Sequence, residues 1–386
     1  MAPRPLRGAR MAWPLGALLA GLALCLAFPP AAVRAASAQS FGWVLDEEGG
    51  RRRFLPMPLG YVPHDVLDTN GTAVGEMNSP QDLFLDHEGH LYVADTGNHR
   101  VLKMTRRGEV LRVYGERSGP ARLNSPQGVY VDPRTGHVYI ADTGNQRVVL
   151  LSQDGQFLRE YRSPESSLLE ADFTFRPEKL VVDRRGYLNI INQGDYRGIL
   201  LLDEEGNFRG FFAPNPVGFD WRRLLIRIFA TEAQRERISR VLPPAHASIT
   251  MDERGFLYTT TTHTTTSQIK RINSIGHNTY PRKPYGVPWR GQGWQVLQPQ
   301  FLDIAVDANG IITVVDGVTQ WIYQYDQDGN NLMTFGWRGD QRGLFGYAVA
   351  LEVDDTGLLY VLDRDKNHIQ VFRPTEVTGL VPRAVT

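Results

Sequence analysis

Residues 78–104 read NSPQDLFLDHEGHLYVADTGNHRVLKM, and residues 124–151 repeat the pattern as NSPQGVYVDPRTGHVYIADTGNQRVVLL. In each stretch a short apolar run leads into a turn that starts with Asp and ends with Gly, and a second apolar run follows. Asp at the first position and Gly at the fourth, as in Asp86 to Gly89, suit a type I turn between antiparallel strands, and the copy from Asp132 to Gly136 has one extra residue. Each stretch therefore predicts a β-hairpin that opens a longer unit.

The same turn recurs along the whole chain. Its six aspartates are Asp86, Asp132, Asp183, Asp252, Asp307 and Asp354. The residues three positions and one position before each aspartate are apolar in every copy, so one face of each first strand should be buried. Most units add a third strand, a second tight turn and a fourth strand. Six units of four antiparallel strands predict an all-β fold, a six-bladed β-propeller.

The last unit ends after its third strand, near Phe372, and needs a fourth strand from elsewhere. An apolar segment at residues 62–68 stands before the first unit, in the place that a fourth strand would take. We expect this N-terminal strand to pair with the last three and close the ring, which removes the open sheet edges. The propeller is predicted to cover residues 62–373, preceded by a hairpin at residues 39–61 and followed by a tail at residues 374–386.

One segment, residues 213–245, breaks the β pattern between the third and fourth units. From Asp220 onward, Trp221, Leu224 and Ile228 fall on one face of a helix, and arginines fall on the others. Asp220 suits the N-cap position. We expect a helical insertion over or beside the mouth of the central channel.

The N-terminus has the order of a secretory signal. Three arginines within the first ten residues precede an apolar stretch at residues 11–28, and small residues follow at residues 36–38. This order predicts that residues 1–38 are a signal peptide and that the rest of the chain is secreted or works in the cell envelope. The alternative is an uncleaved anchor, because about 18 apolar residues just span a bilayer. Cys25 is the only cysteine, so the predicted mature part has no disulfide and no thiolate site.

The charge balance bears on the partner. Lys+Arg and Asp+Glu both number 42, so no net field attracts the chain to nucleic acid or to an anionic membrane. We expect a monomer whose partner is a protein or a small extracellular ligand. Membrane association is expected only through an uncleaved signal anchor.

The units resemble NHL repeats. The first two match best, through the segments NSPQ and ADTGN, the last keeps VLDRDKNHIQVF, and the third to fifth are degenerate. The resemblance covers roughly residues 62–373, and with its FDWRRLL…TEAQRERIS insertion the chain is similar to a group of exported bacterial NHL proteins. It implies an interaction platform. Related six-bladed propellers also include calcium-dependent lactonases of the gluconolactonase type and a metal-dependent peptidyl-hydroxyglycine lyase, whose metal lies in the central channel.

The tight turns join the first strand to the second and the third to the fourth, so they should share one end of the propeller. The other end should carry the loops between second and third strands, including both DTGN segments, and the links between blades. We call it the loop-rich end, and we expect binding there, since irregular loops on a rigid scaffold usually carry function. For the DTGN loops we predict a structural role, with Arg100 and Arg147 pairing with the aspartates.

A polar column should face the central axis. The residues four positions before the turn aspartates are Asp82, Gly128, Lys179, Ser248, Asp303 and Ala350, with Glu352 one pleat deeper. His246 and His263 fall on the same end and are further candidates for this ligand-binding set. One interpretation is a solvated ring with an internal Lys–Asp pair. The other is a Ca²⁺ site built on Asp82, Asp303 and Glu352, since Ca²⁺ takes oxygen ligands in flexible geometry.

Two functions follow from these interpretations. The first is a non-catalytic binding module that holds a protein or a small ligand on the loop-rich end. The alternative is a divalent-metal-dependent enzyme of the lactonase or lyase type with its site in the central channel. The sequence offers no His-Glu-x-x-His and no Gly-x-Ser-x-Gly motif for catalysis.

Overall fold

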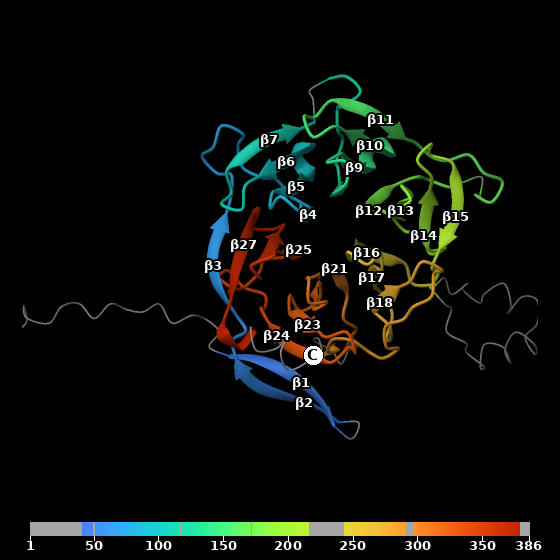
Figure 1. The fold of residues 1–386 in the computed structure, drawn as a ribbon. Helices are drawn as coiled ribbons and strands as arrows, with labels where there is room; N and C mark the ends of the chain where they lie inside the picture. The colour runs from blue at the N-terminus through green and yellow to red at the C-terminus, as the bar shows by residue number, and fades with distance from the viewer. Residues whose placement is uncertain are drawn as a thin grey trace, which may run out of the picture. The chain divides into compact units, whose positions relative to one another are not determined.

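Six antiparallel sheets stand around a central axis (Figure 1). The computed structural model describes residues 41–48, 51–115, 118–170, 172–215, 243–290 and 296–378. The predicted signal peptide lies outside the described residues, as do most of the predicted helical insertion (residues 216–242) and the end of the predicted tail (residues 379–386). The all-β, six-bladed propeller predicted from the repeat is confirmed. No helix in the described part of the chain is long and apolar enough to cross a membrane.

Each blade runs from an inner strand at the axis to an outer strand at the rim. Blade 1 contains β4 (Asp82–Leu85), β5 (Leu91–Asp95), β6 (Arg100–Met104) and β7 (Val110–Tyr114), and blade 2 contains β8 (Gly128–Val131), β9 (Val138–Asp142), β10 (Arg147–Leu151) and β11 (Phe157–Tyr161). Blade 3 contains β12 (Pro177–Val182), β13 (Leu188–Asn192), β14 (Ile199–Leu202) and β15 (Phe208–Phe212). Blade 5 contains β21 (Phe301–Val306), β22 (Ile312–Asp316), β23 (Ile322–Tyr325) and β24 (Asn331–Phe335).

Blade 4 is the exception to the four-stranded pattern. Its sheet holds β16 (His246–Met251), β17 (Leu257–Thr261) and β18 (Ile269–Ile272), and the chain beyond its second tight turn adds only a single bridge between Ile272 and Asn278. The reason lies in two tyrosines that follow. Tyr280 donates to the Asp326 carbonyl at 2.7 Å, and the Tyr285 ring stands 5.3 Å from that of Tyr325, so this segment packs against blade 5 instead.

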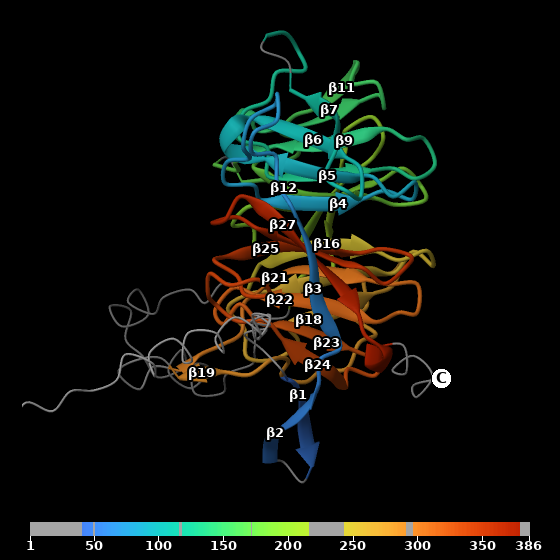
Figure 2. The same ribbon diagram turned by 90° about the vertical axis from the view of Figure 1, so that its left-hand side faces the viewer.

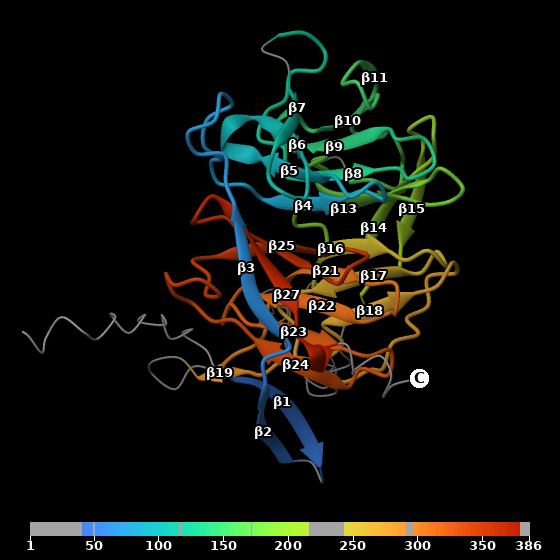
Figure 3. The ribbon, with the colours of Figure 1, turned by 60° about the vertical axis from the view of Figure 1, so that its left-hand side comes forward.

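The predicted closure of the ring by an N-terminal strand is confirmed. Blade 6 contains β25 (Ala348–Val353), β26 (Leu359–Asp363) and β27 (His368–Pro374), and β3 (Tyr61–Leu67) completes it. The register runs from Ile369 opposite Leu67 to Pro374 opposite Tyr61. Figure 3 shows β3 lying along β27, so the first and last strands of the propeller share one sheet.

Two small hairpins lie outside the blades. β1 (Phe41–Glu48) pairs with β2 (Arg51–Pro58), and Trp43 of β1 also pairs with Thr334 at the outer edge of blade 5. β19 (Trp289–Arg290) and β20 (Val296–Leu297) form a two-stranded sheet in the link between blades 4 and 5. Figure 2 shows both hairpins extending away from the blade strands.

The repeated apolar columns form the core between neighbouring blades. The first column consists of Leu83, Val129, Leu180, Ile249, Ile304 and Leu351, and all six are buried.

The turns have the predicted chemistry. In the first, Asp86 Oδ1 accepts the backbone N–H groups of His90 at 2.7 Å and Glu88 at 3.0 Å, and Gly89 closes the turn at a φ of 83°, which favours glycine.

Gly128 marks the closest approach of two blades at the axis. It occupies the polar-column position of blade 2, and a Cβ there would lie 2.3 Å from the backbone carbonyl oxygen of Glu178 at the start of blade 3. Glycine is therefore required for β8 and β12 to pack together.

We predict that Gly128→Ala destabilises the fold by about 1–3 kcal/mol, the usual cost of overpacking. Equilibrium urea unfolding measures the change. The reverse exchange at the equivalent position of blade 6, Ala350→Gly, should cost no more than about 1 kcal/mol. A Gly128→Ala protein as stable as the parent would contradict the close approach of β8 and β12.

Candidate functional site

Three blades send charged side chains to one point on the axis. Asp82 stands at the start of β4, Lys179 lies in β12 and Asp303 lies in β21, so the residues come from blades 1, 3 and 5. Lys179 Nζ lies 2.7 Å from Asp82 Oδ1 and 2.6 Å from Asp303 Oδ1. Ser248 of blade 4 donates to Asp303 Oδ1 at 2.5 Å. We call these four residues the axial cluster, and sequence reasoning placed all four correctly on the same column.

Both carboxylates of the axial cluster have donors on each oxygen. Asp82 Oδ2 accepts the Val129 N–H of blade 2 at 2.9 Å, and Asp303 Oδ2 accepts the Leu351 N–H of blade 6 at 2.9 Å. The two aspartates therefore tie their own blades to the next ones as well as to Lys179. The axial cluster connects all six blades through charge-assisted hydrogen bonds.

The axial cluster is buried rather than solvated. Lys179 is 9% exposed, Asp82 5%, Asp303 4% and Ser248 0%. The cavity that Asp82, Lys179 and Asp303 line, together with Glu352, has a volume of about 30 Å³, room for about one water molecule. The expected internal Lys–Asp pair is present, but it lies in a closed core and not in an open channel.

Burial and charge shape the protonation of this cluster. Burial alone would lower the pKa of Lys179, but the Asp303 and Asp82 carboxylates raise that pKa above its ordinary value, so the ammonium stays charged. Burial raises the pKa of Asp82 to about 6 against the opposing effect of Lys179. Burial, with Asp303 and Asp82 adding to it, raises the pKa of Glu352 well above the usual range. Glu352 is the group that holds a proton here.

The donor set does not fit the Ca²⁺ interpretation. Ca²⁺ takes six to eight oxygen ligands, whereas each oxygen of Asp82 and Asp303 already accepts a hydrogen bond. The ammonium of Lys179 lies between the two carboxylates, where the metal would have to stand. Burial raises the pKa of Glu352, the third expected ligand, and so favours its uncharged form, which attracts a cation weakly. No catalytic step through a metal is derived from these residues.

The two histidine candidates lie away from the axial cavity. His246 is buried, with Nδ1 3.1 Å from Thr259 Oγ1 and Nε2 3.0 Å from the Ala213 carbonyl. Burial, with the positive charge of Lys270 adding to it, lowers the pKa of His246 to about 3, so its ring is neutral. His263 is exposed in the loop after β17, where Nδ1 lies 3.4 Å from Gln300 Nε2. Neither residue lines the cavity.

Lys270 is a buried cation that sequence reasoning missed. It lies in β18, is 7% exposed, and donates to Thr261 Oγ1 at 2.6 Å and to Asn215 Oδ1. Burial lowers the pKa of Lys270 to about 7. The one available signal was a lysine at a position where the first three blades have Leu102, Val149 and Leu200, which is too weak to single it out.

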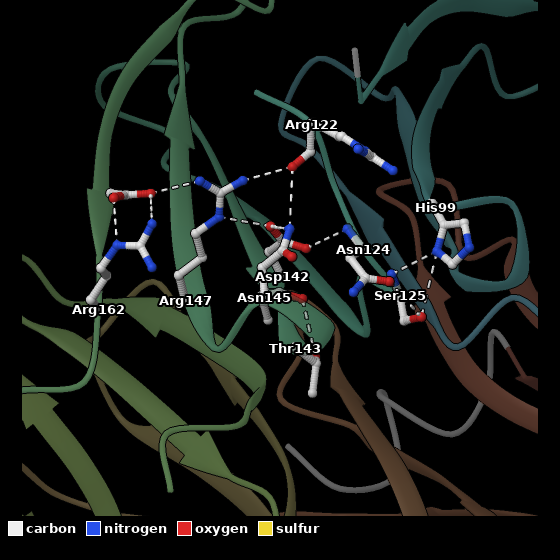
Figure 4. Close-up of polar contacts among 11 residues, drawn as sticks. His99, Arg122, Asn124, Ser125, Asp142, Thr143, Asn145, Arg147 and Arg162 are labelled. Atoms are coloured by element: carbon white, nitrogen blue, oxygen red, sulfur yellow. Dashed lines mark hydrogen bonds and ion pairs between the residues drawn. The ribbon is translucent and has the colours of Figure 1, made fainter. Parts of the chain in front are cut away.

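The DTGN loops form clasps that hold the chain as it enters each blade (Figure 4). Asp142 Oδ1 accepts the Asn124 N–H at 2.7 Å, and Oδ2 accepts Asn145 at 2.8 Å and Arg147 at 2.8 Å. Thr143 Oγ1 donates to the Pro177 carbonyl of blade 3 at 2.6 Å. These contacts are internal, as the structural interpretation of the loops predicted.

The same clasp recurs around the ring. At the end of each second strand except that of blade 4, a carboxylate or amide oxygen accepts a backbone N–H from the segment that leads into the blade. The pairs are Asp95 with Asn78, Asp142 with Asn124, Asn192 with Arg176, Asp316 with Gln300, and Asp363 with Gly346. The loops are therefore held rigidly at their bases.

A cluster of acidic and histidine side chains lies at the opposite end, in the first tight turn. The ligand atoms of Asp86, Glu88 and His90 all lie within 4.8 Å of one another, the one such group among the described residues. His90 Nδ1 lies 3.2 Å from Asp86 Oδ2 and 3.4 Å from Glu88 Oε2. These contacts satisfy the cluster internally.

A model of the NHL repeat matches residues 77–104 and 123–149. The chain contains NHL repeats. The matched segments are blades 1 and 2, the two stretches in which the sequence resembles the repeat best. No curated protein matches the sequence.

Several solved propellers resemble this chain in fold. A streptogramin B lyase shares 14% identity at a TM-score of 0.49, over 88% of this chain and 95% of that one. A catalytically inactive virginiamycin B lyase from Staphylococcus aureus with quinupristin shares 12% at 0.50, over 88% and 97%. The propeller domain of Cps50 (Swd1) from Myceliophteria thermophila shares 11% at 0.49, over 82% and 100%. Such identities bear on the fold alone.

We predict that Lys179→Met destabilises the protein by about 3–5 kcal/mol, because it leaves two buried carboxylates without a counter-charge. The combined variant Lys179→Met, Asp82→Asn, Asp303→Asn should recover part of the loss, because it removes both charges. Urea unfolding of the three proteins makes the comparison. A triple variant less stable than Lys179→Met would show that charge is not what the lysine compensates.

We predict that Glu352→Gln changes the pH dependence of stability. In the folded protein Glu352 keeps its proton, because its pKa is raised well above the ordinary value of 4.5. In the unfolded chain Glu352 releases that proton once the pH exceeds 4.5. Glu352 therefore destabilises the fold as the pH rises. Glutamine has no proton to release. The variant's advantage in unfolding free energy should therefore be absent near pH 4 and grow towards pH 8. Glu205→Gln, an exposed control, should show no such growth, and a flat difference for Glu352→Gln would refute the prediction.

Proposed function

We propose that this protein is a non-catalytic binding module that holds a protein or a small extracellular ligand on its loop-rich end. One observation carries the proposal: the axial cluster is self-satisfied in a cavity of about 30 Å³. Ligand pockets are typically about 300–1,000 Å³. The residues at the axis therefore have a structural role, and the surface loops are the part that recognises the ligand or partner.

The loop-rich end has the properties that a recognition surface needs. The clasps on Asp95, Asp142, Asn192, Asp316 and Asp363 fix the loop bases. Between them the loops differ from blade to blade and present exposed polar residues, among them Gln193, Thr265 and Asp365. A rigid ring that displays variable loops favours binding without an induced change in the backbone. With the predicted signal peptide, this supports a partner outside the cytoplasm.

The test compares the two ends of the propeller with matched charge changes. The loop-rich variant carries Gln193→Arg, Thr265→Arg and Asp365→Arg, and the control carries Gln153→Arg, Asn309→Arg and Asp154→Arg in the tight turns. All six positions are exposed, and each set changes the net charge by the same amount. Immobilised full-length chains are exposed to the secreted and envelope proteins and metabolites of the source cell, and the retained molecules are quantified by mass spectrometry.

We predict that the parent and the tight-turn control retain the same molecules. The loop-rich variant should retain at least tenfold less of them. Equal retention by all three proteins would overturn the proposal. A metal-dependent hydrolysis of a lactone, or a metal-dependent cleavage of a peptidyl-hydroxyglycine, that is abolished by a chelator and by Glu352→Gln would favour the alternative enzyme instead.

A further inference from the structure

A chain of aromatic rings lies beside blade 5, on segments that are far apart in the sequence. Trp43 and Phe54 come from the N-terminal hairpin, Trp289 from β19, Trp321 from the residue before β23, and Trp337 from the link after β24. The ring centroids of Trp43 and Phe54 are 6.4 Å apart, and those of Phe54 and Trp321 are 6.1 Å apart. Trp337 lies 5.1 Å from both Trp289 and Trp321. We call these five residues the aromatic rim.

The aromatic rim is the centre of an exposed apolar surface. Among the described residues, ten large hydrophobic side chains are exposed, and five of them lie on the rim or on its two hairpins. These are Phe54 and Leu55 (both 45% exposed), Trp289 (39%), Val296 (49%) and Leu297 (37%). Single exposed apolar residues need no explanation, but a contiguous patch indicates an interaction surface.

Unpaired cations surround this patch. Arg53 precedes Phe54, Arg290 follows Trp289, and Arg338 follows Trp337, and all three are exposed. In the part of the chain that the structure describes, none of them has a carboxylate partner, whereas ten other arginines do. The patch therefore combines aromatic and aliphatic groups with three exposed arginines.

A cavity with a fourth cation opens beside the patch. It has a volume of about 470 Å³, and Val44, Leu45 and Leu55 of the N-terminal hairpin line one side. Lys283, Asn330 and Asn331 line another side, and no carboxylate pairs with Lys283 in the described chain. The cavity thus offers an apolar wall next to a cation and amides.

The shape of this surface suits a soft, flat partner. Its apolar residues are carried by two hairpins that extend away from the blade strands (Figure 2), so they can enter a soft surface that has no matching groove. Tryptophan is enriched at membrane–water interfaces, where its ring meets the acyl boundary and its N–H meets water. Arginine next to such residues contributes attraction to anionic headgroups.

We propose that the aromatic rim docks the propeller on an anionic phospholipid surface. The apolar side chains of the two hairpins enter the interface, and Arg53, Arg290, Arg338 and Lys283 face the headgroup phosphates. This inference goes beyond the proposed function, because it leaves the loops of the other blades free for their partner. It also differs from the expectation that only an uncleaved signal anchor would bring the chain to a membrane.

The experiment uses the full chain with vesicles of phosphatidylcholine, either alone or mixed with phosphatidylglycerol. Flotation measures the bound fraction, and the emission of the rim tryptophans reports their transfer from water. The parent should bind the anionic vesicles, shift its emission to the blue, and release as salt is added. Any contribution of residues 1–38 is common to all variants and cancels in the comparison.

Two variants test the two parts of the surface. Trp289→Ser with Leu297→Ser should lower partitioning at least tenfold. Arg53→Gln, Arg290→Gln and Arg338→Gln should lower it roughly fivefold for each arginine and remove the preference for anionic vesicles, the equivalent of about 1 kcal/mol per charge. The exchanged arginines are exposed and have no carboxylate partner among the side chains that the structure describes, so folding should be unaffected.

Matched controls lie elsewhere on the propeller. Leu158→Ser with Ile275→Ser removes two exposed apolar side chains, and Arg107→Gln, Arg254→Gln and Arg373→Gln removes three exposed arginines; both should bind like the parent. The loop-rich variant Gln193→Arg, Thr265→Arg, Asp365→Arg should also keep its lipid binding, which separates this proposal from the proposed function. Equal binding by rim variants and controls would overturn it. The proposal would also be overturned if the rim variants lost a protein that the parent and the controls retain, while the rim variants still bound lipid.

Discussion

The pairing of β3 with β27 is the constraint on which the rest of the propeller depends. Without β3, the sheet of blade 6 would hold only three strands, and the outer edge of β27 would be open. With β3 in place, the six inner strands are forced around one axis, and side chains from blades that never touch along the rim meet there. The axial cluster exists only because of that closure. Lys179 reaches both Asp82 and Asp303 across the ring, although they are 97 and 124 residues away in the chain.

The same closure explains why polar groups at the axis are structural here. A buried ammonium between two carboxylates is favourable only when geometry supplies every partner. The backbone N–H groups of Val129 and Leu351 complete the set, so every oxygen of the two carboxylates has a donor. The proposed binding surfaces therefore lie on the loops, which can vary without disturbing the axial cluster. The clasp loops hold those surfaces at fixed positions, and the hairpins beside blade 5 add a second, chemically different surface.

Much of the fold was predictable because the sequence pattern of each blade lies within a short stretch of the chain. The turn aspartates, the apolar columns and the unfilled last blade are all visible within short stretches. The polar column was predictable for the same reason, since Asp82, Lys179, Ser248 and Asp303 share one position in the repeat. Its burial was not, because solvent exclusion depends on how tightly the inner strands approach, as at Gly128. The early end of blade 4 depends on Tyr280 and Tyr285 finding partners on blade 5. The aromatic rim brings Trp43 and Trp337 together across almost 300 residues, and no repeat position connects them.

The joining of the chain's two ends in blade 6 also affects how the protein is made. Strand β3 comes before all six turn aspartates of the repeat, but its partner β27 comes after all of them, at His368–Pro374. Until β27 has been synthesised, β3 has no strand to pair with, and the ring that gathers the axial charges cannot close. The unfinished chain therefore lacks the cooperative contacts of the closed ring. Those contacts would oppose its unfolding into an extended form. A protein with this topology stays compatible with passage through a narrow translocation pore until its last strand arrives.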